Sequence, residues 1–205
     1  ILGDALGERP TEIVVRLSGN IIKNVKSVIV PSTGGMHGIE SAVSAGIVAG
    51  RPERKLEVLS ALGSDAKEQI TTFMQGCKIT VSELSSPCTF DLYLEGRVDG
   101  KFASVRISER HTNVISVIVN GENSADGNGI TKASMEHIFR FADVITTGNH
   151  CFRRKEFTEY YDIKENLLRP ANYPEGVVGK GVVTVDMGRY SFAVINLMGT
   201  AFMEA

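Results

Sequence analysis

The pattern of apolar residues changes along this chain, and the change near residue 114 constrains the fold more than any other feature. From residue 78 to 119 apolar and polar residues alternate, and Asp99 and Gly100 supply a turn, which predicts an antiparallel meander. After residue 114 the pattern becomes one of strands alternating with helices, which predicts α/β structure. We therefore expect an α+β piece over residues 1–115, made of helices and the meander, joined to an α/β piece over 116–205.

Individual elements follow from periodicity and turn residues. Strands are predicted where β-branched or alternating residues occur, at 11–18, 27–30, 114–119 and 143–147, with a hairpin over 181–197. Helices are predicted where apolar residues recur at helical intervals, at 39–49, 55–62, 65–75, 131–141 and 151–160. Thr131 is the candidate N-cap of its helix.

Composition excludes several classes of function. The 205 residues are 42% hydrophobic and 22% charged, and the formal net charge is −2, so we expect neither a nucleic-acid groove nor a polybasic membrane anchor. The most apolar stretch, residues 39–50, is too short to span a bilayer. Three cysteines without paired spacing predict neither a disulfide framework nor a zinc knuckle. These features predict a soluble, cytoplasmic protein.

Ligand-type side chains follow two of the predicted strands. Glu122 and Asn123 come after the strand at 114–119, and Asn149 and His150 come after the strand at 143–147. Residues at the carboxyl ends of strands in an α/β sheet meet in a common crevice. Carboxylate, carboxamide and imidazole groups together suit Mn²⁺, Fe or Zn²⁺. The sequence thus predicts a divalent-metal site, with His150 either a ligand or the group that protonates a leaving group.

Residues 116–205 resemble the YmdB-like metallophosphoesterases, a calcineurin-like family of phosphodiesterases acting on 2′,3′-cyclic nucleotides. The matching segments are residues 120–123, 126–131, 148–150, 168–176 and 193–199. The resemblance implies that Glu122 and Asn149 are metal ligands, with Asn123 and His150 at the metals or the scissile phosphate. The family's first metal-binding Asp has no counterpart between residues 100 and 116, so we expect weak or incomplete metal binding.

Structural interpretations of the same residues stay open. Glu122 and Asn123 suit a turn after a strand, and Asn149 suits a helix N-cap. The basic run at 153–155 is more typical of a solvated helix face than of a phosphate clamp.

A second candidate site lies near the N-terminus, in the turn-rich loop at 31–38. Ser32, Thr33, Gly34 and Gly35 precede a predicted helix, where backbone N–H groups favour an anion. Residues 1–115 resemble serine dehydratase α-chain-like proteins, which include iron–sulfur L-serine dehydratases and L-cysteine desulfidases. The resemblance, carried by residues 18–24, 30–50, 56–60 and 111–113, implies that the loop binds a substrate carboxylate near His111. Cys77 and Cys88 do not match the family's cluster cysteines, so no iron–sulfur cluster is expected on this chain.

The two resemblances meet near Ile115 without overlap, which predicts a fused chain. The favoured function is a metal-dependent phosphodiesterase acting on a small phosphoester. The alternatives are a fragment of an amino-acid lyase and an inactive fusion whose open sheet edges drive homo-oligomerisation.

Overall fold

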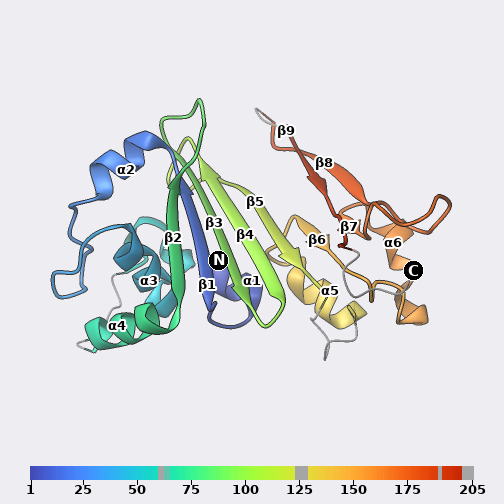
Figure 1. Ribbon diagram of the computed structural model, residues 1–205, viewed down its shortest axis with the longest axis horizontal. Helices are drawn as coiled ribbons and strands as arrows, with labels where there is room; N and C mark the ends of the chain where they lie inside the picture. The colour runs from blue at the N-terminus through green and yellow to red at the C-terminus, as the bar shows by residue number, and fades with distance from the viewer. Residues whose placement is uncertain (60–62, 64, 123–128, 189–190, 200–205) are drawn as a thin grey trace. The chain divides into compact units, whose positions relative to one another are not determined.

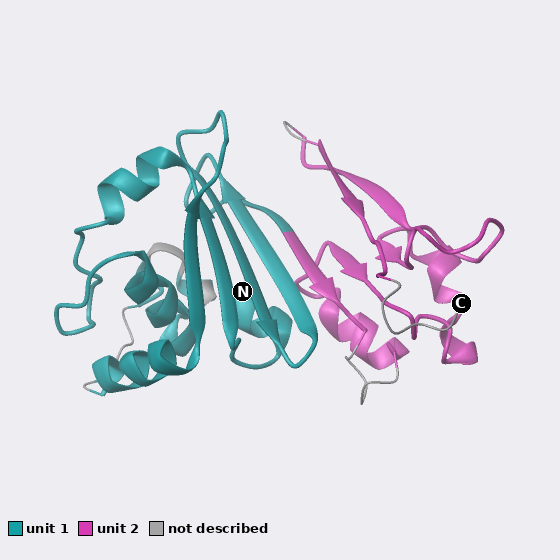
Figure 2. Ribbon diagram, viewed as in Figure 1, with its two compact units in different colours: residues 1–116 teal, residues 117–205 magenta. Residues whose placement is uncertain are grey.

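The computed structural model describes residues 1–59, 63, 65–122, 129–188 and 191–199. It divides into two compact units, residues 1–116 and 117–205, which are coloured separately in Figure 2. Figure 1 shows helices and a sheet in each unit, so the predicted combination of α+β and α/β structure is confirmed. Within the described residues, none of the helices has the length and apolar character needed to cross a bilayer.

The first unit builds its sheet from four strands in the order β2-β1-β3-β4. The strands are β1 (Glu12–Leu17), β2 (Lys78–Glu83), β3 (Asp91–Val98) and β4 (Lys101–Ser108). The helices are α1 (Leu2–Leu6), α2 (Gly19–Val25), α3 (Ile39–Ala49) and α4 (Ala66–Gly76), with a 3₁₀ helix η1 (Pro52–Glu57). The β3–β4 hairpin turns at Asp99 and Gly100, both with positive φ, as predicted.

Three predicted elements of this unit were wrong. The segment at 78–83 does not join an antiparallel meander, because β2 pairs with β1 in parallel, Glu12 opposite Lys78. The chain reaches β2 through α2, α3 and α4, and such a crossover delivers a strand parallel to the first. The predicted strand at 27–30 is only an isolated bridge between Ile29 and His37. Of the helix expected at 55–62, residues 55–57 belong to the 3₁₀ helix η1, residues 58 and 59 form a turn, and residues 60–62 lie outside the described residues.

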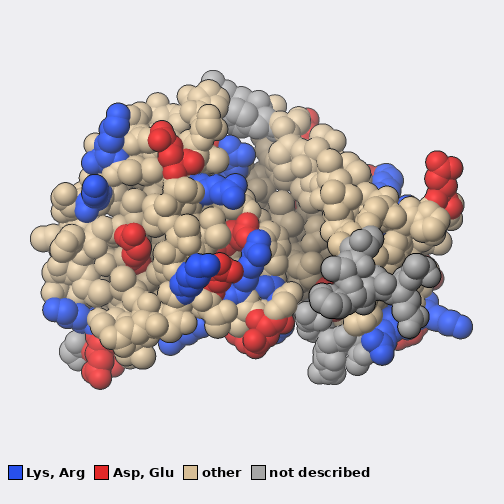
Figure 3. Space-filling view, in the orientation of Figure 1, with Lys and Arg blue, Asp and Glu red and all other residues tan. Residues whose placement is uncertain are grey.

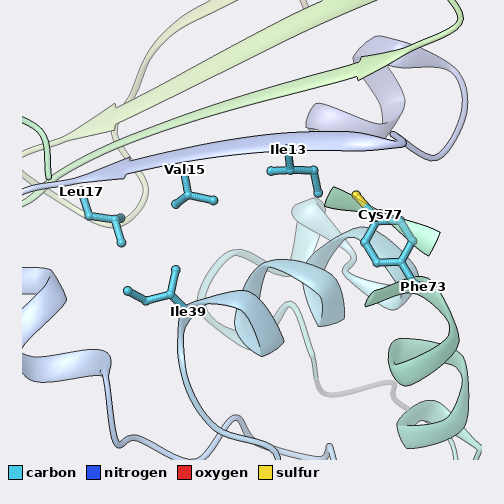
Figure 4. Packing of buried hydrophobic residues seen from close by; sticks show 6 residues of the cluster. All are labelled: Ile13, Val15, Leu17, Ile39, Phe73 and Cys77. Atoms are coloured by element: carbon cyan, nitrogen blue, oxygen red, sulfur yellow. The ribbon is translucent and has the colours of Figure 1, made fainter. Parts of the chain in front are cut away.

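The core of the first unit lies between one face of the sheet and the helices. Alternate residues of β1 are buried, and they pack with side chains from α3 and α4 (Figure 4): Ile13, Val15, Leu17, Ile39, Phe73 and Cys77. This burial of every second residue is the strand periodicity that the sequence predicted. Cys77 is thus a core residue, whose pKa is raised by burial and by the charge of Glu12. Positive and negative side chains are interspersed on the visible face of this unit (Figure 3).

The opposite face of this sheet carries a buried ion pair. Asp91, fully buried at the start of β3, accepts hydrogen bonds from Nε and Nη2 of Arg106 at 3.0 and 2.7 Å. Ser86 Oγ donates a third at 2.6 Å. Burial alone would raise the pKa of Asp91, but these hydrogen bonds and the guanidinium charge outweigh it and hold the pKa below its usual range.

The second unit begins within β5 (Val114–Asn120) and contains a parallel arrangement of β5, β6 (Val144–Thr146) and β7 (Leu167–Leu168). Helix α5 (Lys132–Ile138) precedes β6, while η2 (Lys155–Phe157) and α6 (Tyr160–Ile163) precede β7. The hairpin of β8 (Val182–Asp186) and β9 (Ser191–Ile195) packs on the sheet through buried Val144, Leu168 and Val194.

Of two local predictions for this unit, one is confirmed and one is wrong. Thr131 caps α5 as predicted, because its Oγ1 accepts the Ser134 N–H while the Ser134 hydroxyl accepts the Thr131 N–H. The single helix predicted over 151–160 is wrong. Residues 149–154 form turns, and only the short η2 and α6 follow.

Candidate functional site

The candidate site lies where β5 and β6 end. These strands run parallel, with Asn120 opposite Thr146, so their carboxyl ends lie side by side. Glu122 follows β5, and its backbone N–H is fixed by the side chain of Asn120 at 2.9 Å. Residues 148–151 follow β6 as a tight turn. The sheet therefore brings together two segments that are 26 residues apart in sequence.

The carboxylate of Glu122 organises the turn after β6. One oxygen accepts the backbone N–H of Gly148, and the other accepts the backbone N–H of His150 at 3.0 Å. The Glu122 side chain is only 14% exposed, so these hydrogen bonds are protected from water. A carboxylate has about four lone-pair sites, so each oxygen can still accept another partner.

His150 lies against this carboxylate. Its Nδ1 is 3.3 Å from Oε1 of Glu122, yet this buried atom makes no hydrogen bond within the described residues. Its Nε2 lies 3.2 Å from Nη1 of Arg153. A guanidinium can only donate, so Nε2 is the acceptor of this contact. Glu122 thus accepts the backbone N–H of His150 and also lies against its ring.

Cys151 and Tyr173, to which the sequence pattern assigned no role, support this turn. The Cys151 thiol is buried, and burial followed by the charge of Glu122 raises its pKa. The Tyr173 hydroxyl bonds to this thiol and donates to the backbone oxygen of Asn149 at 3.3 Å. Burial and its contacts with Cys151 raise the pKa of Tyr173 to about 12. Both groups therefore stay protonated at neutral pH and act as structural donors.

Buried polar residues join the sheet to the β8–β9 hairpin beside the site. Asn196, just after β9, donates from Nδ2 to the backbone oxygens of Thr147 at 2.7 Å and Leu168 at 3.1 Å. The Thr147 hydroxyl accepts from buried Tyr161 at 3.1 Å and donates to Leu168 at 2.8 Å. Asn196 and Tyr173 belong to segments that carried the family resemblance, which was the only signal that could have pointed to them.

Asn196→Ala tests this connection. The substitution leaves the carbonyls of Thr147 and Leu168 buried without their donor, so we expect a loss of about 2 kcal/mol in unfolding free energy. Asn172→Ala is the matched control, because Asn172 also bonds to backbone, at Met198, but is exposed to water. Urea denaturation followed by circular dichroism should give less than about 1 kcal/mol for the control. Equal losses would contradict the assigned role of Asn196.

The other predicted site residues are distributed as follows. Asn149 is exposed beside His150, while Asn123 lies outside the described residues. Within the described residues, no group of three or more His, Cys, Asp or Glu side chains is arranged to hold a metal ion. Of the predicted ligands, Glu122 and His150 are the two that the structure brings into contact after the ends of β5 and β6.

The predicted anion loop at 31–38 does precede α3. Ser32, Gly34 and Gly35 have positive φ. Thr33 is buried, and its hydroxyl donates to the backbone oxygen of Val30 at 2.8 Å, closing its own turn. His111 is exposed and contacts Phe90, with ring centroids 4.3 Å apart and the rings tilted by 43°. The carboxylate-binding role of this loop and the role of His111 stay predictions.

Parallel strands with polar groups following their carboxyl ends define the second unit as an α/β unit. The family model described as YmdB-like protein matches residues 103–205, half of the chain. The chain belongs to the YmdB-like family, as the resemblance predicted for this part.

Individual relatives cover the two parts differently. A 2′,3′-cyclic-nucleotide 2′-phosphodiesterase of Bacillus subtilis (strain 168) is 45% identical over 87 residues, 42% of this chain and 33% of that protein. A UPF0597 protein of Desulfitobacterium hafniense (strain Y51) is 40% identical over 119 residues, 58% of this chain and 28% of that protein. The chain thus spans about a third of the length of these curated relatives.

Two further similar proteins have names that state no activity. A UPF0597 protein of Finegoldia magna is 38% identical over 118 residues, 57% of this chain and 28% of that protein. A solved structure of a hypothetical protein from Thermus thermophilus is 35% identical, with a TM-score of 0.40 over 43% of this chain and 35% of that one. The name UPF0597 states no activity, so the serine dehydratase resemblance and the fusion stay predictions.

Proposed function

We propose that residues 117–205 contribute the Glu122–His150 part of a metal-dependent phosphodiesterase site for 2′,3′-cyclic nucleotides. The observation that carries the proposal is the pairing of Glu122 with His150 at the ends of two neighbouring parallel strands. The 45% identity to a 2′,3′-cyclic-nucleotide 2′-phosphodiesterase supports this choice of substrate. The substrate would be a small cytoplasmic phosphoester.

The described residues fit a divalent cation chemically. Glu122 retains lone pairs beyond the two backbone hydrogen bonds. Glu122 would hold the ion with Asn149 and Asn123, while His150 would lie at the scissile phosphate, and Mn²⁺, Fe and Zn²⁺ accept carboxylate and carboxamide ligands. When bound, the ion would activate water and stabilise charge on the phosphoryl oxygens.

The residues of this chain would then act on the ester bond. Hydrolysis forms a bond from a water oxygen to phosphorus and breaks the bond from phosphorus to the ribose 2′-oxygen. The leaving oxygen would take a proton from the ring of His150, the attacking water would release its proton to the solvent, and His150 would regain a proton from the solvent. Glu122 keeps the ring oriented through the 3.3 Å contact, and Asn123 would assist at the scissile phosphate.

Metal dependence is the direct test. Mn²⁺ is titrated by calorimetry into the chelator-treated chain, and hydrolysis of 2′,3′-cyclic AMP is followed on the same sample. We expect saturable binding, with hydrolysis that is lost on chelation and restored by metal. Hydrolysis that is unchanged by chelation, or no metal binding at all, would refute the proposal.

A further inference from the structure

The guanidinium of Arg153 lies beside His150 of the candidate site. Arg153 is exposed to solvent, yet its Nη1 is directed at Nε2 of His150, 3.2 Å away. The predicted helical face does not exist here, because residues 149–154 form turns. Arg153 therefore projects from the same turn that carries Asn149 and His150.

This contact uses only one of the N–H donors of Arg153. A guanidinium carries five N–H donors in a rigid fork that matches the paired oxygens of a phosphate, whereas one imidazole nitrogen takes a single donor. A neutral imidazole is also a weaker partner than an anion, since hydrogen bonds to charged acceptors are about twice as strong. An anionic oxygen pair beside His150 would displace the imidazole from Arg153.

The neighbouring arginine supplies an independent observation. Nε of Arg154 is buried and has no hydrogen-bond partner within the described residues, while its Nη1 is 4.0 Å from Glu156. Arg153 and Arg154 are thus consecutive arginines of this turn, and Nε of Arg154 is a donor that none of the described residues accepts.

We propose that Arg153 binds the phosphoryl oxygens of the substrate, exchanging its contact with the imidazole of His150 for one with the phosphate. The inference rests on the proposed phosphodiesterase function and assigns its anion-recognition residue.

The test measures binding of inorganic phosphate to the full chain without metal, by calorimetry, for the wild type and three variants. We expect Arg153→Ala to weaken binding at least about tenfold and Arg153→Lys to weaken it less, because lysine keeps the charge but loses the fork. Lys155→Ala removes the same charge from an exposed position two residues on, and we expect a change below about twofold.

Each outcome decides the inference. Equal weakening in Arg153→Ala and Lys155→Ala would overturn it, because only net charge would matter, and so would an absence of phosphate binding by the wild type. The assay needs neither metal nor turnover, so it separates the two proposals. If phosphate binding depends on Arg153 but the chain does not hydrolyse 2′,3′-cyclic AMP when metal is supplied, the anion site is supported and the phosphodiesterase is refuted. Where hydrolysis occurs, we expect Arg153→Ala to raise KM about tenfold.

Discussion

We expect His150→Ala to reduce metal-stimulated hydrolysis of 2′,3′-cyclic AMP by at least about a hundredfold, because a positioned acid–base group contributes roughly 10²- to 10⁴-fold. The substitution removes the imidazole but keeps the backbone N–H that Glu122 accepts, so the turn keeps this support. The measurement is the initial rate at saturating Mn²⁺. The melting temperature, measured in parallel, should change little.

His137→Ala is the matched control, since His137 is an exposed histidine of α5 in the same unit. Its rate should stay within about twofold of the wild type. If the two histidine variants hydrolyse the substrate equally well, His150 has no catalytic role. A large drop in the melting temperature of His150→Ala would indicate a structural role instead.

The second large effect is expected on stability, at Asp91. Its side chain is 1% exposed and is paired with Arg106, so Asp91→Ala leaves a cation without its partner. Removing one partner of a fully buried pair costs roughly 3–5 kcal/mol, but Arg106 is 38% exposed and can be hydrated, so we expect about 2–3 kcal/mol. Urea denaturation followed by circular dichroism measures this, since the chain has no tryptophan to report by fluorescence.

The same pair predicts a pH dependence. The pKa of Asp91 is lower in the folded state than in the unfolded chain, so the pair stabilises the protein above the unfolded pKa, near about 4. This stabilisation is lost as pH falls through the lowered folded pKa. The stability difference between the wild type and Asp91→Asn should therefore be full at neutral pH and shrink below about pH 4.

Glu12→Gln is the control for Asp91, because Glu12 pairs with Lys78 at 3.1 Å on the surface. Exposed pairs contribute less than about 1 kcal/mol, so this variant should be close to wild type. A loss at Asp91 no larger than that at Glu12 would show that the buried pair does not stabilise the first unit.

The candidate site shows which long-range relations a sequence pattern can anticipate. Glu122 and His150 each follow an apolar strand, and parallel neighbouring strands end at the same edge, so their proximity could be predicted. The contacts that fix the site could not be predicted from the sequence pattern. Tyr173 and Cys151 meet only because residues 169–176 return to the turn after β6, and nothing local to either residue encodes that pairing.

By itself the sequence determined the features that depend on near neighbours: the buried alternation of β1, the turn at Asp99 and Gly100, the cap at Thr131 and the fold class. These follow from side-chain periodicity and backbone preferences within a few residues. Only the tertiary structure decided that β2 lies parallel to β1, that residues 149–154 turn rather than coil into a helix, and that Glu122 holds that turn. The reason is physical: strand pairing and buried hydrogen bonds join residues far apart in sequence, and burial determines which of the alternative partners is stable.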